Sequence, residues 1–225
     1  MQPEPHRRKG LLLADMDSTL IGQECIDELA DFAGLKEHVS AITERAMRGQ
    51  IAFEPALRER VALLKGLSET IVATVLRDRI TLTPGARTLV QTMRANGAYC
   101  ALVSGGFTLF TGPVARALGF DEHRGNSLLA DAGTFTGKVG EPILGREAKL
   151  AALVELRERR GLAPVATLAV GDGANDLAML GEAGFVVAFR AKPAVAAAAD
   201  GRIDYGDLSA LLYAQGYRLA EIVTL

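Results

Sequence analysis

The sequence has few cysteines and no long apolar run, and both absences restrict what the chain can be. Its two cysteines, Cys25 and Cys100, lie far apart without the spacing of a metal site or a disulfide framework, so we expect buried free thiols. No apolar run reaches the roughly 18 residues of a membrane span, and residues 1–9 lack the apolar core of a signal peptide. We therefore predict a cytoplasmic protein without a membrane partner.

The sequence also lacks any block of charge of one sign. Its 25 Lys and Arg nearly balance its 27 Asp and Glu, which gives a net charge of -2 and no indication of a nucleic-acid partner. Small-molecule chemistry is the better expectation. The short basic cluster His6 to Lys9 is interpreted as a solvated, frayed chain end. The 225 residues, 49% of them hydrophobic, allow one large domain or two unequal ones.

The region from about residue 21 to residue 79 has helical periodicity and no strand pattern. Apolar residues recur at helical spacing over 26–33, 39–49 and 54–66, and Ser68 is predicted to cap a fourth helix. Roughly 60 residues of helix are far more than a strand-to-strand crossover needs. We therefore predict a helical cap domain at 21–79, inserted into a core domain formed by 1–20 and 80–225.

Helices and apolar strands alternate from Thr83 onward. Strands are predicted at 11–14, 99–103, 166–170 and 185–188, with helices at 86–96, 107–118, 146–160 and 174–182. This alternation predicts the α/β class, with a doubly wound parallel sheet covered by helices on both faces. Residues 126–142 depart from the pattern, and Gly133 and Gly137 there favour a small antiparallel hairpin or flap.

Polar residues follow three of the predicted strands at the point where each ends. The carboxyl ends of parallel strands meet at one edge of a sheet, where ligands bind, so these residues are expected to converge. They are Asp15 and Asp17 after the first strand, Ser104, Gly105 and Gly106 after the second, and Gly171-Asp172-Gly173-Ala174-Asn175-Asp176 after the third, with Lys149 on the helix between the last two.

The combination of these groups indicates phosphate chemistry. Several carboxylates in one site repel each other unless a cation is present, and hard oxygen ligands favour Mg²⁺. Ser104 and the Gly105 N–H at a helix start suit a phosphate, and Lys149 can neutralise further oxygen charge. An exposed Asp can attack phosphorus while a second protonates the leaving alkoxide. Each motif alone also fits turn chemistry or a solvated helix, and only their joint occurrence favours a site.

These motifs resemble those of the haloacid dehalogenase superfamily. Asp15-Met16-Asp17-Ser18-Thr19, Ser104-Gly105-Gly106, Lys149 and Gly171 to Asp176 are similar to its four motifs, in order, and the resemblance covers the chain from Leu11 to about Tyr213. The Ser-Gly-Gly-Phe and Gly-Asp-Gly-Ala-Asn-Asp versions, together with Glu24, resemble the branch that hydrolyses O-phospho-L-serine. Members with an additional amino-terminal regulatory domain are known, and this sequence resembles the short form, for which feedback by serine is not expected.

The resemblance implies a role for each residue of the site. Asp15 would be the nucleophile and Asp17 the general acid and base. Mg²⁺ would be held by the carboxylates of Asp15 and Asp172 and by the backbone carbonyl of Asp17. The supporting residues would be Asn175 and Asp176, and the phosphate would be held by Ser104, Gly105 and Lys149.

The predicted cap would determine the substrate. A zwitterionic amino acid needs an anion for its ammonium group and a guanidinium for its carboxylate. Glu24 and Arg60 match the positions that the resemblance assigns to these roles, and Met47 and Phe53 match its apolar wall. Read without the resemblance, Glu24 and Arg60 are surface charges, and Met47 and Phe53 are core residues.

The sequence leaves three functions open. The first is Mg²⁺-dependent hydrolysis of phosphoserine, the last step of serine biosynthesis, by a monomer or homodimer. The second is a relative of the same fold that transfers the phosphoryl group to an acceptor such as homoserine, or that hydrolyses another small phosphate ester. The third is a protein that binds a phosphorylated ligand without turnover, which the Asp15 and Asp17 pair disfavours because binding needs no acid for a leaving group.

Overall fold

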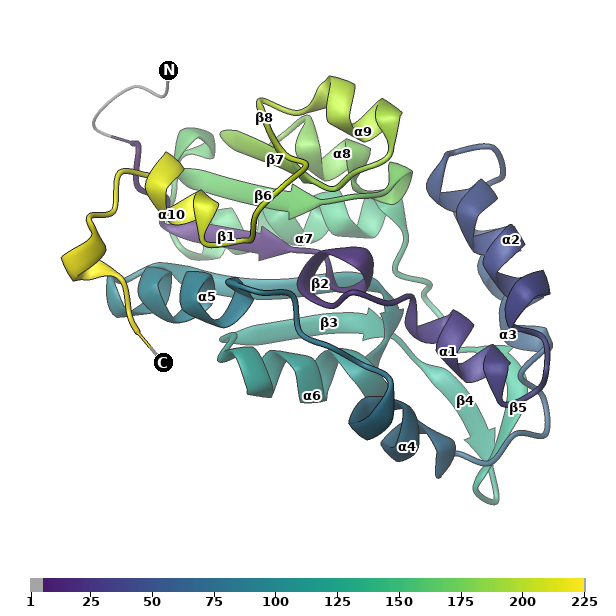
Figure 1. The fold of residues 1–225 in the computed structure, drawn as a ribbon. Coiled ribbons are helices and arrows are strands. Elements are labelled where there is room, and N and C mark those ends of the chain that lie inside the picture. The colour runs from purple at the N-terminus through teal and green to yellow at the C-terminus, as the bar shows by residue number, and fades with distance from the viewer. Residues whose placement is uncertain (1–5, 225) are drawn as a thin grey trace.

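A parallel sheet forms the centre of the molecule (Figure 1). The computed structural model describes residues 6–224. The sheet has six strands in the order β3-β2-β1-β6-β7-β8, and every neighbouring pair is parallel. The strands are β1 (Leu11–Ala14), β2 (Tyr99–Phe107), β3 (Glu122–Asn126), β6 (Thr167–Gly171), β7 (Phe185–Phe189) and β8 (Gly201–Ile203).

β1 lies in the middle of the sheet, where the strand order reverses. It pairs with β2 on one side and with β6 on the other, and all four of its residues are buried. A strand covered on both faces needs apolar residues throughout, which is why Leu-Leu-Leu-Ala forms it. A reversal of strand order opens a crevice at the carboxyl ends of the strands. The predicted doubly wound parallel sheet is therefore confirmed, and its crevice lies where β1 and β6 end.

Helices cover both faces of the sheet. Because side chains alternate along a strand, Leu12 and Leu102 join one buried cluster, whereas Leu11, Leu13 and Val103 join another. The first cluster includes residues of α5 (Ala86–Ala95), α6 (Thr108–Leu118) and α10 (Ala210–Ala214), and the second includes residues of α7 (Arg146–Arg159), α8 (Leu177–Leu180) and α9 (Pro193–Ala198).

The region between β1 and α5 is helical, as predicted. Its helices are α1 (Cys25–Asp31), α2 (Lys36–Met47), α3 (Phe53–Ala62) and α4 (Ile71–Asp78). The predicted capping role of Ser68 is wrong: α4 begins at Ile71, and the Ser68 hydroxyl accepts the N–H of Thr70 at 3.3 Å. Ser68 instead forms an isolated β-bridge with Thr134, so this region also contributes a short extended segment.

The predicted hairpin is present as β4 (Leu128–Asp131) and β5 (Thr134–Val139), which pair antiparallel. It packs against α3 and the loop that follows α3. The Gly66 N–H donates to the Phe135 carbonyl at 2.9 Å, and the Phe135 N–H donates to the Leu67 carbonyl at 2.9 Å. The hairpin therefore joins the inserted helices rather than the central sheet, as its place beside α3 in Figure 1 shows.

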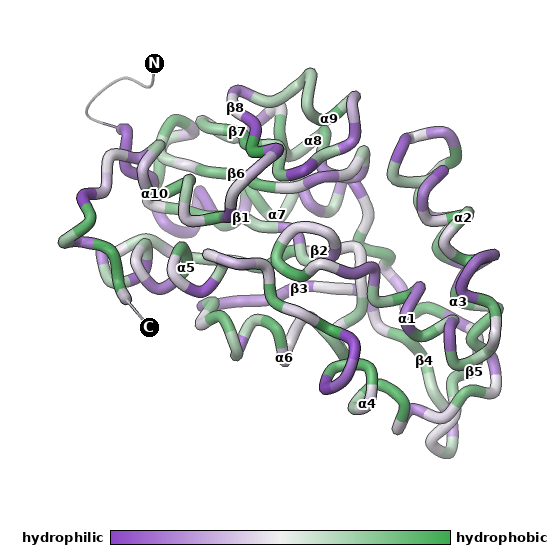
Figure 2. The backbone as a smooth tube through the Cα atoms, viewed as in Figure 1, coloured by the Kyte–Doolittle hydropathy of each residue, from purple (hydrophilic) through white to green (hydrophobic). Residues whose placement is uncertain are grey.

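Two edge strands were missed because their sequences are polar. β3 reads Glu-His-Arg-Gly-Asn and is drawn in pale and purple shades in Figure 2, so it has no apolar pattern to detect. β8, at the other edge, is only Gly-Arg-Ile. β2 also runs four residues beyond its predicted end at Val103, through Ser104 to Phe107, because an irregular register against β3 keeps this segment extended.

The amino-terminal basic cluster is bound to the protein, contrary to the prediction of a frayed end. Arg8 forms an ion pair with Glu221 at 2.8 Å and lies 4.4 Å from the centre of the Tyr217 ring. Lys9 is 3% exposed, and its Nζ donates to the Val165 carbonyl at 2.7 Å. These partners come from distant parts of the chain, so local sequence does not reveal them.

Two other sequence expectations concern burial. Both cysteines are buried and free, as predicted. Across residues 6–224 no helix combines the length and the apolar character that crossing a bilayer requires.

The polar edge of the sheet gives a prediction about stability. Glu122 accepts hydrogen bonds from Tyr99 and from Arg124, and it pairs with Arg159. Burial alone would raise the pKa of Glu122, but these donors lower it to about 2. The folded-state pKa of Glu122 is below its ordinary value, so the interactions of the Glu122 carboxylate stabilise the fold above about pH 4.5. This contribution disappears as the pH falls toward 2.

We expect Glu122→Gln to lower the free energy of unfolding by about 1 kcal/mol at pH 7, after allowance for solvent screening. The difference from the wild type shrinks as the pH falls below about 4.5. Urea unfolding at a series of pH values measures both quantities. Glu158→Gln, on the exposed side of α7, is the matched control. A difference that stays constant down to pH 3 contradicts the assignment.

Candidate active site

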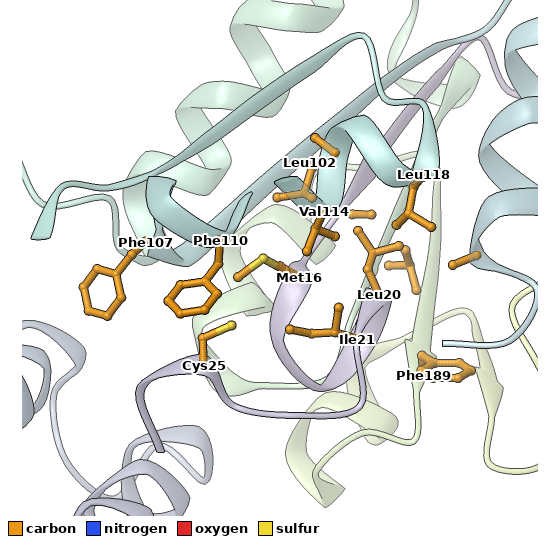
Figure 3. Packing of buried hydrophobic residues seen from close by; sticks show 14 of the residues in the cluster. Met16, Leu20, Ile21, Cys25, Leu102, Phe107, Phe110, Val114, Leu118 and Phe189 are labelled. Atoms are coloured by element: carbon orange, nitrogen blue, oxygen red, sulfur yellow. The ribbon is translucent and has the colours of Figure 1, made fainter. Parts of the chain in front are cut away.

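The crevice begins where β1 enters a tight turn, η1 (Met16–Leu20), in which Asp17 and Ser18 have non-helical backbone dihedrals. The Asp15 N–H still donates to the Val170 carbonyl of β6 at 3.0 Å, and the Asp15 Oδ1 accepts the N–H of Met16 at 2.8 Å. Figure 3 shows Met16 and Leu20 directed into the apolar cluster beside α6. These buried side chains anchor the turn, and so they hold the Asp15 carboxylate at the end of the strand.

Lys149 is the central cation of the site. It is fully buried, and its Nζ lies 2.7 Å from Asp15 Oδ2 and 2.7 Å from Asp176 Oδ1. Burial lowers the pKa of Lys149, but the charges of Asp15 and Asp176 outweigh that effect and raise the pKa above its ordinary value. A lysine that remains charged fixes both carboxylates. The alternative of a solvated helix residue is therefore wrong.

Three carboxylates gather around this lysine. Oxygen atoms of Asp15, Asp172 and Asp176 lie within 4.8 Å of one another, and all three residues are buried. The Thr19 hydroxyl donates to Asp172 at 3.2 Å. Burial and the charges of Asp15 and Asp176 raise the pKa of Asp172 well above its usual range, and burial together with Asp15 raises that of Asp176 to about 7. One ammonium group does not balance this charge.

The surplus of carboxylate oxygen fits a divalent cation. Hard oxygen ligands at this spacing suit such an ion, which would relieve the repulsion that raises these pKa values. The Asn175 Oδ1 in the same loop is buried and has no hydrogen-bond partner among the described residues. Asp176, predicted only as a supporting residue, lies within the carboxylate group, whereas the side chain of Asp17 does not.

Close packing at Gly171 makes the Asp176 position specific. A Cβ atom at Gly171 would lie 2.3 Å from Asp176 Oδ2, so the carboxylate reaches its place only because residue 171 has no side chain. The same oxygen accepts the Gly173 N–H at 3.2 Å. The two glycines of this loop therefore serve the placement of Asp176.

The Ser104-Gly105-Gly106 segment lines the same cavity as Asp15. The Ser104 hydroxyl is buried and accepts the N–H of Gly106 at 3.0 Å. The Asn126 amide donates to the Gly105 carbonyl at 2.7 Å and to the Leu144 carbonyl at 3.1 Å, which ties this segment to the chain ahead of α7. Asn126 was not predicted as a site residue, because it ends a strand that has no apolar signal.

Asp17 lies outside the cluster of three carboxylates but lines the same cavity as Asp15. Its Oδ1 accepts the N–H of Cys25 at 3.4 Å. Burial raises the pKa of Asp17 to about 7, and the charge of Asp15 adds to this effect while Cys25 and Lys149 oppose it. A carboxyl group with a pKa near neutrality both donates and accepts a proton readily, which is what a general acid and base requires.

The inserted helices supply the roof of the site. Glu24, Met47, Phe53 and Arg60 line the same cavity as Asp15, Asp17, Ser104, Gly105 and Asn175. The Phe53 ring closes on the Ser-Gly-Gly segment: a Cβ at Gly105 would lie 2.7 Å from Phe53 Cζ. Every substrate-binding residue predicted from the sequence is therefore brought to one cavity.

Glu24 and Arg60 are not surface charges. Glu24 accepts the Ser18 hydroxyl at 2.6 Å, and burial, with the charges of Asp17 and Asp172, raises its pKa well above the usual range. Arg60 is 5% exposed, and its Nη1 donates to the Thr43 hydroxyl at 3.0 Å. Among the described residues, Glu24 and Arg60 do not form an ion pair with each other. Both side chains therefore remain available to a ligand.

This fold and site define the class of protein. A model of the haloacid dehalogenase-like hydrolase family matches residues 12–181, and the chain belongs to that family. The match covers most of β1, the inserted helices, the Ser-Gly-Gly segment, Lys149 and the Asp172 loop.

The individual proteins that this chain resembles indicate a narrower group within the family. The chain is 48% identical to a phosphoserine phosphatase of Polaromonas sp., over 90% of this chain and 88% of that one, and 47% identical to one of Albidiferax ferrireducens, over 90% and 87%. A solved substrate-bound phosphoserine phosphatase complex is similar at 40% identity with a TM-score of 0.88, covering 92% of this chain and 98% of that one. A phospho-aspartyl intermediate analogue of phosphoserine phosphatase has a TM-score of 0.87 at the same identity and coverage.

The carboxylate cluster gives a prediction about metal binding. We expect a saturating divalent cation to raise the melting temperature of the wild type by several degrees, because binding to the folded state alone at about 100 times Kd contributes roughly 2.7 kcal/mol. Asp172→Asn removes one ligand and one repelling charge. This variant should therefore melt at or above the wild-type temperature in EDTA and lose most of the shift.

Thermal unfolding followed by circular dichroism, with EDTA and with added Mg²⁺, measures both effects. Asp131→Asn, at the exposed end of β4, is the matched control and should retain the wild-type shift. An undiminished shift in Asp172→Asn would show that the cation binds elsewhere.

Proposed function

We propose that this protein hydrolyses O-phospho-L-serine to L-serine and phosphate, and that it requires Mg²⁺. The observation that carries the proposal is the single cavity lined by Asp15, Asp17 and Ser104 on one side and by Glu24 and Arg60 on the other. The first group suits transfer of a phosphoryl group, and the second suits an amino acid with free ammonium and carboxylate groups.

In the proposed first step, the Asp15 carboxylate attacks phosphorus. A bond forms between an Asp15 oxygen and phosphorus, and the bond between phosphorus and the serine oxygen breaks. Asp17 gives its proton to the departing alkoxide. Ser104 and the Gly105 N–H bind the phosphate oxygens, and Lys149 keeps the Asp15 carboxylate in place while offsetting the negative charge.

In the second step, Asp17 takes a proton from water, and the oxygen of that water attacks the aspartyl phosphate. The bond between Asp15 and phosphorus breaks, which restores the carboxylate and releases phosphate. A pKa near 7 for Asp17 supports its use in both directions.

The Mg²⁺ ion would be held by Asp15 and Asp172, with the Asp17 carbonyl as a further ligand and Asn175 and Asp176 in support. When bound, it would neutralise charge on the phosphate oxygens. Asp176 would serve mainly to hold Lys149, since its two oxygens are already engaged by Lys149 and Gly173.

We further propose that residues 21–79 act as a cap over the core formed by 1–20 and 80–225. Contact of Phe53 with Gly105 and the ion pair between Glu44 of α2 and Lys192 at 2.7 Å support closure over the cavity. A small phosphoamino-acid substrate suits a site enclosed in this way. The cytoplasmic location, the absence of a nucleic-acid or membrane partner and the monomeric or homodimeric state stay predictions from the sequence.

Phosphate release tests the proposed reaction. The wild type should release phosphate from phosphoserine with Mg²⁺ and not with EDTA, and Asp15→Asn should lose at least 10³-fold in kcat because an amide is a poor nucleophile. Homoserine added as an acceptor should yield no homoserine phosphate. Near-wild-type turnover by Asp15→Asn would exclude the aspartyl phosphate, and formation of homoserine phosphate would identify a transferase.

The leaving group tests the role of Asp17. A serine alkoxide needs protonation as it departs, whereas 4-nitrophenolate does not. We therefore compare two rates in Asp17→Asn: turnover of phosphoserine, and formation of the aspartyl phosphate from 4-nitrophenyl phosphate, measured as a burst of nitrophenolate. We expect the substitution to lower the first rate at least tenfold more than the second. Equal losses on both substrates would argue against proton donation by Asp17.

A further inference from the structure

A chain of polar side chains runs through the interior of the inserted helices and ends at Arg60. Asp27 of α1 is 9% exposed, and its Oδ1 accepts the Thr43 hydroxyl of α2 at 2.7 Å. Thr43 is 3% exposed, and its oxygen accepts the Arg60 Nη1 group of α3 at 3.0 Å. The chain therefore links α1, α2 and α3 at one point.

The other bonds of this network leave the guanidinium incompletely satisfied. The second oxygen of Asp27 accepts the Ser40 hydroxyl at 2.7 Å, so the carboxylate is engaged on both sides. Arg60 Nε donates to the Ala56 carbonyl of its own helix at 3.1 Å. A guanidinium has five N–H donors, and no acceptor is found for the Nη2 group among the residues that the structure describes.

A buried arginine without a carboxylate partner is costly unless something else takes its free donors. Arg60 lines the cavity that Glu24 and Asp17 also line, so its side chain borders the space that a ligand would occupy. The position of Thr43 explains how the cavity keeps this cation available. A direct ion pair between Asp27 and Arg60 would compensate the charge of the guanidinium and occupy its donors. A hydroxyl between the two residues instead orients the guanidinium and leaves its remaining N–H donors free.

We propose that Asp27 and Thr43 are positioning residues that fix the Arg60 guanidinium for a substrate carboxylate, and so determine selectivity for phosphorylated amino acids over phosphorylated amines. Thr43 receives the Nη1 group. The Thr43 hydroxyl hydrogen is directed away from Arg60, toward Asp27 Oδ1 at 2.7 Å and the Val39 carbonyl of its own helix at 3.0 Å. This inference rests on the proposed function, because it requires Arg60 to bind the carboxylate of phosphoserine.

Two substrates separate this role from a purely structural one. Phosphoserine and O-phosphoethanolamine share the phosphate ester and the ammonium group, but only phosphoserine has a carboxylate. The measured quantity is the ratio of kcat/KM for phosphoserine to kcat/KM for phosphoethanolamine. A variant that merely loosens the fold lowers both values and leaves the ratio in place.

We expect Thr43→Val, which has nearly the same shape, to lower this ratio about tenfold, mainly through KM for phosphoserine. Thr43→Ser should restore most of it, because the hydroxyl returns. Ser40→Ala is the matched control: it removes the other hydroxyl on Asp27, which does not touch Arg60, and should change the ratio less than twofold. A ratio in Thr43→Val that equals the wild-type value overturns the inference.

Arg60→Lys distinguishes failure of this inference from failure of the proposed function. If Arg60 binds the carboxylate, Arg60→Lys lowers the ratio, since an ammonium group cannot form the two-pronged contact. Adding Thr43→Val to Arg60→Lys should then cause no further loss, because Thr43 acts through Arg60. An unchanged ratio in Arg60→Lys refutes the carboxylate contact itself, whereas additive losses refute only the positioning role of Thr43.

Discussion

The buried ammonium group of Lys149 is the interaction on which the site depends. It lies 2.7 Å from both Asp15 and Asp176, with no exposure to solvent. Two buried carboxylates would repel each other without it, and a buried lysine without them would lose its charge. The three groups come from β1, α7 and the loop after β6. The parallel sheet with its central reversal of strand order is the framework that brings these segments together.

The ammonium group of Lys149 does not compensate all of the negative charge around it. Asp172 adds a third carboxylate within 4.8 Å of Asp15 and Asp176, which leaves negative charge for a cation to neutralise. The inserted helices have the opposite imbalance, because Arg60 is buried with donors unused and lies near Glu24 without pairing with it. Asp15 of the carboxylate cluster and Arg60 line the same cavity. Unbalanced charge of both signs at one cavity is expected for a site that recognises a charged ligand and binds a metal.

The strands with strong apolar patterns were predicted well. β1, β6 and β7 are buried on both faces, so their composition alone identifies them. β3 and β8 have polar sequences and lie at the edges of the sheet. They are extended because they pair with β2 and β7, and their side chains give no sign of this pairing. The bound position of Arg8 and Lys9 escaped prediction for a related reason, since their partners lie more than 150 residues away.

The site residues show the same division. The motifs at the ends of β1, β2 and β6 were found because carboxylates, hydroxyls and glycines in those positions have few structural explanations. Asn126, which holds Gly105, and Thr43, which holds Arg60, carry no such signal: either residue alone is an ordinary polar residue of a strand or helix. Only the packing of distant elements shows what they contact.

The sequence by itself therefore determined the class of fold, the order of its helices and apolar strands, and the chemical groups of the site. It did so because burial requires apolar periodicity and because clustered charge needs a chemical reason. The tertiary structure decided how these groups pair: Lys149 with Asp15 and Asp176, the hairpin with α3, and Arg60 with a hydroxyl instead of a carboxylate. Those choices depend on distances of a few ångströms between segments far apart in the chain, and local sequence patterns do not encode such distances.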